Sequence, residues 1–391
     1  MFFEHNDLFS AAGWDVVPFA MHHRKNVESQ WTRYFVEEIE LGNKRDSVTE
    51  RIRKGLKSIY SFEAQNRVRE LIQITKPCLA HAHNIYHHLS PSILGTIRRE
   101  GLPVVVTLHD LKIACPAYKM MTHDGVCERC KNGRLYNVIR HRCIHGSVTL
   151  SSLVFAETVV HRILQSYDKY VNMFFVPSRF NISKFVDWGW REDRFRYLPN
   201  FVDTASFVPE YQPGESFVYV GRLSPEKGVA TLLRAAQNIG AHLLIIGSGP
   251  EEPALRRLAN QPGAQIEFLG FRQGEQLHGL IKQARALILP SECYENAPMA
   301  VLEAYALGKP VLGANIGGIP ELIREGETGL TFASGSIESL SEAMTTMMQL
   351  STEAIIAMGQ RARDFVTENF SSHSYLERCS RLYDELLARD S

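Results

Sequence analysis

Short apolar runs alternate with stretches of helical periodicity along almost the whole chain. Strands that alternate with helices form parallel sheets covered by helices, because the connection between two parallel strands must cross the sheet. The sequence therefore predicts an α/β fold. The predicted strands are residues 16–20, 79–83, 104–108, 173–177 and 196–198, and then 217–220, 242–246, 266–269, 286–289, 311–314 and 329–332.

The chain has 391 residues, which is too long for one ordinary domain. The two series of strands are separated by residues 200–214, which have the proline, glycine and polar content of a linker. We expect a first domain at 1–199 with a cysteine-rich insertion at 115–146, and a second domain at 200–370. A C-terminal helix at 371–391 is expected to pack back on the first domain.

Composition excludes several classes of protein. Hydrophobic residues make up 45% and charged residues 22%, so the chain can bury a full core and is not disordered. Lys plus Arg equals Asp plus Glu at 43 each, so no overall field attracts nucleic acid, and none is expected as a partner. No apolar run approaches the roughly 18 residues of a membrane helix, and Met1–His5 does not resemble a secretory signal. We therefore expect a cytoplasmic location.

Two glycine turns follow the first two strands of the second series. Residues 221–228 combine glycines with Arg222 and Lys227 at the carboxyl end of a strand and at the start of a helix. Glycines let the backbone approach a ligand, and the helix start and the cations favour an anion such as a diphosphate. A solvated loop with incidental charges is equally compatible with this segment. Gly247 and Gly249 form the second turn.

Two glutamates mark the segment 290–304, which leaves a strand and enters a helix. Glu295 lies in the loop, and Glu303 lies in the helix after seven intervening residues, on a largely apolar stretch. A partly buried carboxylate needs a donor, which ligand hydroxyls can supply. Alternatively, Glu295 caps the helix and Glu303 pairs with a basic neighbour. A further glycine turn at 317–321 places Glu321 at a helix start.

The chain resembles the signature of retaining glycosyltransferase family 4 in five motifs, and the resemblance covers nearly the whole chain. In order, the motifs are residues 221–223, residues 226–228, residues 247–249, the pair Glu295 and Glu303, and residues 317–321. The resemblance implies a GT-B fold, in which two Rossmann-like domains face each other across a cleft. The donor is then a UDP- or GDP-sugar, bound by the second domain. No catalytic metal is needed if cations and a helix start neutralise the leaving diphosphate.

The same resemblance implies roles for individual residues. Arg222 and Lys227 bind the diphosphate beside Gly247 and Gly249, and Glu303 accepts the ribose hydroxyls. Glu295 holds the sugar together with the backbone amides from Asn296 through Ala297 and Pro298 to Met299. His109, beyond the strand 104–108, helps to orient that sugar, although a capping pair with Asp110 explains it as well. His81 and His83 alternate along a strand, point the same way and are expected to line the cleft.

Four of the seven cysteines, Cys115, Cys127, Cys130 and Cys143, lie in the insertion, and the central two are separated by two residues. This spacing suits a structural, tetrahedral zinc ion, while disulfides and reduced thiols remain alternatives. A subset of the family resembles this stretch. The insertion is locally basic, which suits a polyprenyl-linked glycan or peripheral contact with the inner face of a membrane, although a solvated face is the commoner explanation. The basic side chains are those of Arg129, Lys131, Arg134, Arg140, His141, Arg142 and His145.

The beginning of the chain departs from the family pattern. Residues 2–12 resemble the second half of a helix closed by Gly13 and followed by a strand, whereas family members open with a strand and a Gly-Gly loop. We expect the first domain to lack its first strand. Either Met1 is not the natural start or the first domain is weakened.

The predicted function is transfer of a sugar, with retention, from a nucleotide-diphosphate donor to a glycan or lipid-linked glycan in bacterial surface polysaccharide biosynthesis. Two alternatives are a catalytically weak subunit that binds sugar nucleotides and a zinc-stabilised nucleic-acid module. The balanced charge disfavours the second.

Overall fold

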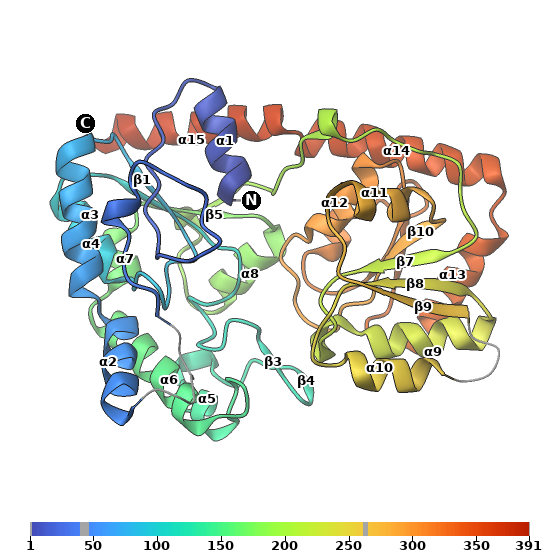
Figure 1. The fold of residues 1–391 in the computed structure, drawn as a ribbon, viewed down its shortest axis with the longest axis horizontal. Coiled ribbons are helices and arrows are strands. Elements are labelled where there is room, and N and C mark those ends of the chain that lie inside the picture. Colours follow the sequence, from blue (N-terminus) through green and yellow to red (C-terminus); the bar gives the residue numbers. More distant parts are fainter. Residues whose placement is uncertain (1, 40–46, 261–264, 391) are drawn as a thin grey trace.

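The computed structural model describes residues 2–39, 47–260 and 265–390. Met1, on which the expectation about the chain's start rests, lies outside these residues. Two separate parallel sheets, each with its own helices, lie beside each other, and a pair of long C-terminal helices runs along one side of both (Figure 1). This is the predicted α/β architecture of two Rossmann-like domains.

The first sheet has the strand order β1-β2-β5-β6, and all its neighbours are parallel. Its central strands are buried along their whole length, which explains their unbroken apolar sequences. The strands are β1 (Ala80–His83), β2 (Val104–Thr107), β5 (Met173–Val176) and β6 (Phe195–Tyr197). The helices of this half are α1 (Phe2–Ala11), α2 (Val48–Ile59), α3 (Phe62–Thr75), α4 (Ser92–Arg99), α5 (Asn137–Arg140), α6 (Val148–Ile163), α7 (Ser166–Tyr170) and α8 (Arg179–Asp187).

The prediction of a strand at 16–20 is wrong. The structure gives these residues no ladder, and the nearest pairing is an isolated bridge between Met21 and Val36. Trp14 and Val16 pack instead against an apolar cluster that includes the C-terminal helix. The apolar run thus reflects side-chain burial without strand pairing. The preceding helix α1 is present as predicted, and Gly13 follows it at φ +88°.

The second sheet has six parallel strands in the order β12-β11-β10-β7-β8-β9. Its core is larger than that of the first sheet and contains the fully buried Phe217, Leu287 and Tyr305. The strands are β7 (Phe217–Val220), β8 (His242–Ile246), β9 (Gln265–Gly270), β10 (Ala286–Leu289), β11 (Val311–Ala314) and β12 (Gly329–Phe332). The helices are α9 (Val229–Ile239), α10 (Glu252–Ala259), α11 (Gly274–Lys282), α12 (Met299–Ala306), α13 (Ile337–Gln349) and α14 (Thr352–Phe370).

The final helix, α15 (Ser372–Asp390), returns to the first half (Figure 1). Tyr375, Tyr383 and Leu386 are buried in one cluster with Val105 and Phe175 of the first sheet. The two places where the chain passes between the halves are adjacent, since Val202 forms a bridge with Ser371.

The cysteine-rich insertion leaves the first sheet after β2 and forms a small antiparallel hairpin of β3 (Met121–Thr122) and β4 (Gly125–Val126). In Figure 1 this hairpin extends toward the second half. Across the described residues, no helix is long and apolar enough to cross a bilayer.

Candidate active site

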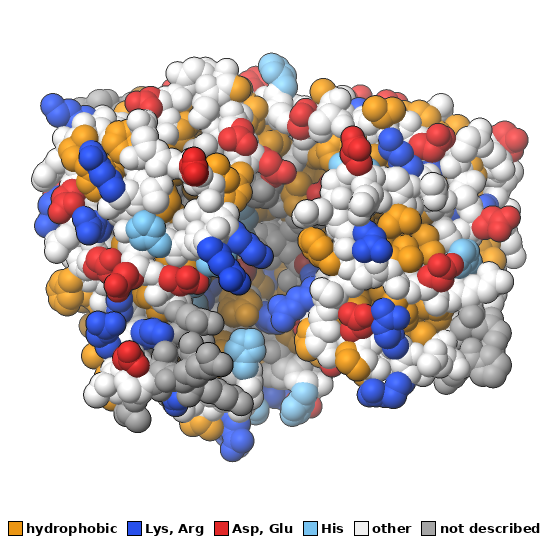
Figure 2. Space-filling view, viewed as in Figure 1, with side chains coloured by type: hydrophobic (Ala, Val, Ile, Leu, Met, Phe, Trp, Pro, Cys, Tyr) orange, Lys and Arg blue, Asp and Glu red, His pale blue; other side chains and the backbone are white. Residues whose placement is uncertain are grey.

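A hollow separates the two halves in the space-filling view, and basic side chains flank it (Figure 2). The loops after β7 and β10 and the end of β2 lie close together, since Lys227 pairs with Glu295 and Asn296 donates to the carbonyl of Leu108. Carboxyl ends of parallel strands are the usual ligand-binding edge of such sheets, because the loops there are free to vary. Most of the predicted site residues lie on these loops.

Lys227 and Glu295 meet across two loops of the second half. Lys227 Nζ lies 2.6 Å from Glu295 Oε1, and Ser291 Oγ donates to the same oxygen at 2.7 Å. Burial alone would lower the pKa of Lys227, but the neighbouring Glu295 outweighs it and raises that pKa, so the ammonium stays charged. The sequence suggested both residues but not that they pair.

Arg222 is exposed, and among the described residues its guanidinium has no partner. Its backbone carbonyl accepts a hydrogen bond from Tyr219 Oη at 2.8 Å, which fixes the loop. A cation with its donors free at the mouth of a cleft can bind an anion without first breaking an ion pair.

Glu303 lies on α12 and is half-buried. Burial raises the pKa of its carboxyl, and Glu4 on α1 adds to the rise. Within the described part of the chain this carboxylate accepts no hydrogen bond, so the predicted basic neighbour is not found. A carboxylate held in this way is ready to accept hydroxyl donors from a ligand.

Gly247 and Gly249 lie where the β8 loop passes the β7 loop. Gly247 has φ +138°, and a Cβ on it would lie 1.8 Å from the carbonyl oxygen of Gly221. Only glycine lets the two loops approach so closely. At Gly249 a Cβ would lie 2.2 Å from the carbonyl oxygen of Leu223.

Asn296 connects the two halves. Its side chain donates to the carbonyl of Leu108 at 3.0 Å and accepts from Ser178 Oγ at 2.7 Å. His109 is therefore positioned beside the segment that begins at Glu295. The carbonyl of Ala297 accepts a hydrogen bond from the side chain of Asn200 at 2.8 Å. Pro298 is the N-cap of α12, and Met299 is the first residue of that helix.

His109 belongs to a row of rings. Its Nε2 lies 2.9 Å from His83 Nδ1, and burial lowers its pKa to about 4, so the imidazole is neutral near pH 7. His81 and His83 have ring centroids 4.2 Å apart, as their shared face of β1 predicted.

Sequence reasoning missed two contacts between the halves. Glu321 lies on the 3-10 helix η6 (Ile319–Leu322), and its carboxylate accepts the backbone N–H groups of Arg179 and Phe180, the first residues of α8, at 2.8 and 2.5 Å. Lys119 of the insertion pairs with Glu226 at 2.7 Å. No local sequence pattern connects Glu321 with α8 or Lys119 with Glu226, so only the tertiary structure reveals these contacts.

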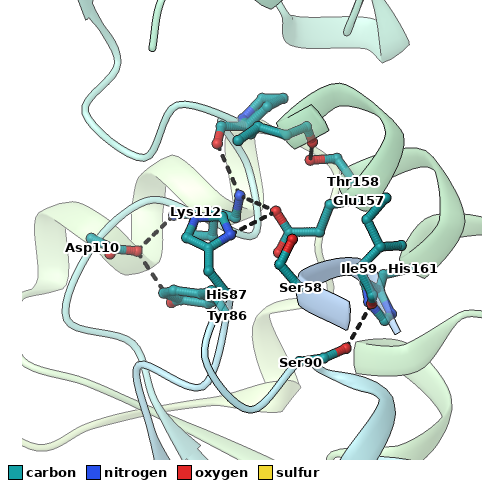
Figure 3. Close-up of polar contacts among 12 residues, drawn as sticks. Ser58, Ile59, Tyr86, His87, Ser90, Asp110, Lys112, Glu157, Thr158 and His161 are labelled. Atoms are coloured by element: carbon teal, nitrogen blue, oxygen red, sulfur yellow. Dashed lines mark hydrogen bonds and ion pairs between the residues drawn. The ribbon is translucent and has the colours of Figure 1, made fainter. Parts of the chain in front are cut away.

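A buried ion pair fixes the loop that leads from His109 into the insertion (Figure 3). Glu157 of α6 lies 2.9 Å from Lys112 Nζ and 3.2 Å from His87 Nδ1. Lys112 also donates to the carbonyl of Pro116 at 3.1 Å, next to Cys115. Through Lys112, the network holds the segment from His109 to Cys115, the site loop, against α6.

The four insertion cysteines line one small cavity of about 10 Å³, and none forms a disulfide. Burial raises the pKa of Cys115 to about 11 and that of Cys130 to about 12, so these thiols are protonated without a metal. The sulfur donors suit zinc. The spacing is looser than a tetrahedral site, however, because no three of these described sulfurs lie within 4.8 Å of one another.

Residues 206–365 match the family model of glycosyl transferases group 1. Among curated proteins, the chain is 31% identical over 249 residues to a GDP-mannose-dependent alpha-(1-6)-phosphatidylinositol monomannoside mannosyltransferase of Mycobacterium tuberculosis. The match covers 57% of this chain and 63% of that protein, so the chain spans less than two thirds of this relative's length.

Two solved structures show the fold of this chain. Sucrose-phosphate synthase of Thermosynechococcus elongatus aligns with a TM-score of 0.72 and 20% identity over 98% of this chain and 92% of that one. HepE of Anabaena in complex with UDP-glucose aligns with a TM-score of 0.61 and 17% identity over 82% of each. The architecture is therefore GT-B, as predicted.

Proposed function

We propose that this protein is a retaining glycosyltransferase that moves a sugar from a nucleotide-diphosphate donor to a glycan or lipid-linked glycan. The observation that carries the proposal is the contact of Lys227 with Glu295 between the segments that follow the neighbouring strands β7 and β10, which also carry Arg222 and Glu303. In this division, residues 200–370 bind the donor and residues 1–199 contribute the acceptor side.

The donor diphosphate is assigned to Arg222 and Lys227. Lys227 pairs with Glu295 in the absence of a ligand. When a diphosphate binds, the ammonium of Lys227 contacts it as well, and one oxygen of Glu295 is then free to accept the sugar hydroxyls. As the bond between the sugar and the diphosphate breaks, its electron pair moves to a phosphate oxygen. The acceptor hydroxyl forms the new bond and gives up its proton, which that phosphate can take. The two cations stabilise the charge that develops there.

Glu303 and His109 are assigned to binding and orientation. The half-buried Glu303 accepts ribose hydroxyls, which accounts for a carboxylate with no hydrogen-bond donor among the described residues. The neutral His109 can donate or accept a hydrogen bond at the sugar without carrying charge. The mycobacterial relative is named for GDP-mannose and the HepE structure holds UDP-glucose, which supports a GDP- or UDP-sugar as donor.

The acceptor is assigned to the first half and the basic insertion. A polyprenyl-linked or other lipid-linked glycan carries phosphate, which the basic side chains of 129–145 can attract. The relative named above acts on a phosphatidylinositol glycan, which supports this class of acceptor. We place the protein in the cytoplasm, at the inner face of the membrane, in surface polysaccharide biosynthesis. Its seven free thiols suit a reducing compartment.

Ligand titration separates the assigned roles. Lys227→Ala should weaken binding of both pyrophosphate and the preferred nucleoside diphosphate by about tenfold or more, because one charge-assisted contact is lost. Glu303→Ala should weaken only the nucleoside diphosphate, because pyrophosphate has no ribose. Calorimetric titration of UDP, GDP, ADP and pyrophosphate measures both effects.

Arg257→Ala removes an exposed cation from α10 and is the matched control, which should leave all four affinities unchanged. If Glu303→Ala weakens pyrophosphate as much as the nucleotide, Glu303 does not bind the ribose. The anomeric configuration of the product, read by proton NMR, tests retention.

A catalytically weak sugar-nucleotide-binding subunit is a second candidate, and one observation favours it. Strand β1 forms an edge of the first sheet, and a cavity of about 260 Å³ lies against it. Nucleotide affinity without transfer to any lipid-linked glycan would support this candidate over the enzyme.

For the insertion we propose one structural zinc ion held by Cys115, Cys127, Cys130 and Cys143. Their shared cavity supports this assignment, and zinc would draw the sulfurs together and displace the thiol protons. Metal analysis of protein purified without added zinc should find about one zinc per chain fewer in Cys127→Ser than in the wild-type protein. Four thiols that react freely in metal-free native protein would contradict it.

A further inference from the structure

Three histidines from two elements meet at the edge of the first sheet. His5 lies on α1, and His81 and His83 lie on β1. One ligand nitrogen from each lies within 4.8 Å of the other two. No other three His, Cys, Asp or Glu side chains in the described part of the chain come as close together.

Local structure explains this meeting. His81 and His83 are two residues apart on a strand and therefore share a face. The first turn of α1 lies over that face, where the ring of His5 stacks on Phe9 at a centroid distance of 4.5 Å. The centroid of His5 is 5.0 Å from that of His81 and 5.5 Å from that of His83.

Each ring has a second nitrogen held by a neighbour. Tyr375 Oη lies 3.0 Å from His5 Nδ1, and Tyr383 Oη lies 2.6 Å from His81 Nδ1. Hydrogen bonds of this kind fix the tautomer and the orientation of imidazoles that bind metals. Both tyrosines come from α15, so the C-terminal helix supports the cluster. His83 Nδ1 is held by His109 instead.

The other nitrogen of each ring, Nε2, differs in its contacts. His83 Nε2 has no hydrogen-bond partner among the described residues, and His5 Nε2 has only a long contact of 3.4 Å to Tyr383. His81 Nε2 contacts Thr107 Oγ1 at 2.6 Å, so an ion at this nitrogen would replace that contact. Burial lowers the pKa of His5 to about 4 and the pKa values of the other two well below the usual range, so all three rings keep their lone pairs.

The cluster lies at one wall of the 260 Å³ cavity, which is otherwise largely apolar. Asn6 also lines this cavity, and its Oδ1 is buried with no hydrogen-bond partner among the described residues. A metal-bound water in the cavity could donate to that oxygen. Two independent features, the three close imidazoles and the unpaired carbonyl oxygen, therefore line the same cavity.

We propose that His5, His81 and His83 bind one divalent transition metal ion of the zinc class, with a water or a small ligand completing its coordination from the cavity. Imidazole donors select zinc, copper or nickel, whereas magnesium and calcium require oxygen ligands. The ion joins α1 to β1 and, through the tyrosine hydroxyls, to α15. This site is separate from the cysteine cavity and does not depend on the proposed sugar transfer.

Cobalt titration of the full chain, purified without a histidine tag, distinguishes the two metal sites. Thiolate ligands give cobalt an intense charge-transfer absorption, whereas nitrogen ligands give only weak d–d bands. In Cys127→Ser/Cys130→Ser, we expect one cobalt ion with weak d–d bands alone. Competition with zinc should then displace it. If that double variant does not fold, the same weak bands should appear in the wild-type chain beside the thiolate signal.

Ligand and control variants complete the test. In the Cys127→Ser/Cys130→Ser background, His5→Gln and His83→Gln should each weaken this ion by at least tenfold and abolish the rise in Tm that zinc produces there. In the same background, Tyr383→Phe should weaken the ion by roughly tenfold. His373→Gln, which changes an exposed histidine of α15, should alter neither reading. If no ion binds with nitrogen ligands, or if His5→Gln and His83→Gln leave it unchanged, the cluster is only a hydrogen-bonded group of neutral rings and the proposal fails.

Discussion

At the scale of single residues, the charges that matter here are held by partners distant in sequence. Glu157 is the clearest case, because its ion pair with Lys112 holds the site loop against α6. Burial would raise the pKa of its carboxyl, but Lys112 and His87 outweigh burial and lower that pKa to about 2. The titratable groups that face it are Lys112, His87, His161, Tyr86 and Tyr167.

This pKa predicts loss of stability in acid. The folded value of about 2 lies below the ordinary 4.5, so the stabilisation is complete above about pH 5 and is lost as the pH falls toward 2. The shift corresponds to about 3 kcal/mol in the free energy of unfolding. Glu157→Gln should therefore cost about that much at pH 7, because it leaves Lys112 buried and unpaired.

Urea unfolding of both proteins between pH 7 and pH 3 measures this difference, which should shrink as the pH falls. Glu377→Gln, at an exposed pair with Arg381, should cost almost nothing at any pH. A difference that stays constant with pH would show that Glu157 is not the titrating group.

The sequence could indicate site residues only where a local motif carries them. Arg222 and Lys227 follow a strand and precede a helix, so their place at the sheet edge was predictable. The pairing of Lys227 with Glu295 was not, because it joins two loops. His5 was missed for the same reason. Alternation showed that His81 and His83 share a face, but no local pattern connects that face to α1.

At the scale of elements, ten of the eleven predicted strands are present. The central ones, such as β2 and β10, are buried throughout and have the apolar sequence that parallel strands covered on both faces require. The exception, 16–20, is also largely apolar, but it forms no ladder: its Ala20 carbonyl accepts a hydrogen bond from the N–H of Val36, beside the isolated bridge at Met21. Apolar content therefore indicates burial, and only the tertiary structure decides whether the backbone pairs.

The start of α8 allows a prediction at this scale. Glu321 accepts the first two N–H groups of this helix from the opposite half of the molecule, a contact that combines a cap with a favourable charge at the helix dipole. Glu321→Ala should reduce the free energy of unfolding by about 1–2 kcal/mol. It should also accelerate amide hydrogen exchange in the first turn of α8.

Exchange in α14 serves as an internal reference, and Glu385→Ala, at an exposed position of α15, is the control variant. If Glu321→Ala destabilises the protein but leaves amide exchange in the first turn of α8 unchanged, Glu321 does not hold the two halves together through that helix.

At the scale of the whole molecule, α15 completes the core of the first half although it follows the second half in sequence. Leu386 is 3% exposed within that core. Leu386→Ala should cost about 2–5 kcal/mol of unfolding free energy, because it leaves a cavity beneath the first sheet. Ile163, which is 75% exposed, should tolerate the change to alanine within about 0.5 kcal/mol.

Thermal unfolding followed by calorimetry checks both variants. If the first half is what loses stability, the shift in Leu386→Ala should be accompanied by weaker cobalt binding at the histidine cluster, which α15 supports. A destabilisation that leaves this site intact would place the effect of Leu386 elsewhere.

The two crossings between the halves lie side by side, with Val202 bridged to Ser371 and its N–H bonded to the carbonyl of Phe370 at 2.9 Å. Two adjacent connections constrain relative motion more than one does. They leave one easy motion of the two halves, a hinge rotation about the line through both crossings. They oppose sliding and twisting of one half against the other. Each opening of the hollow must therefore return the loops after β2, β7 and β10 to the same alignment.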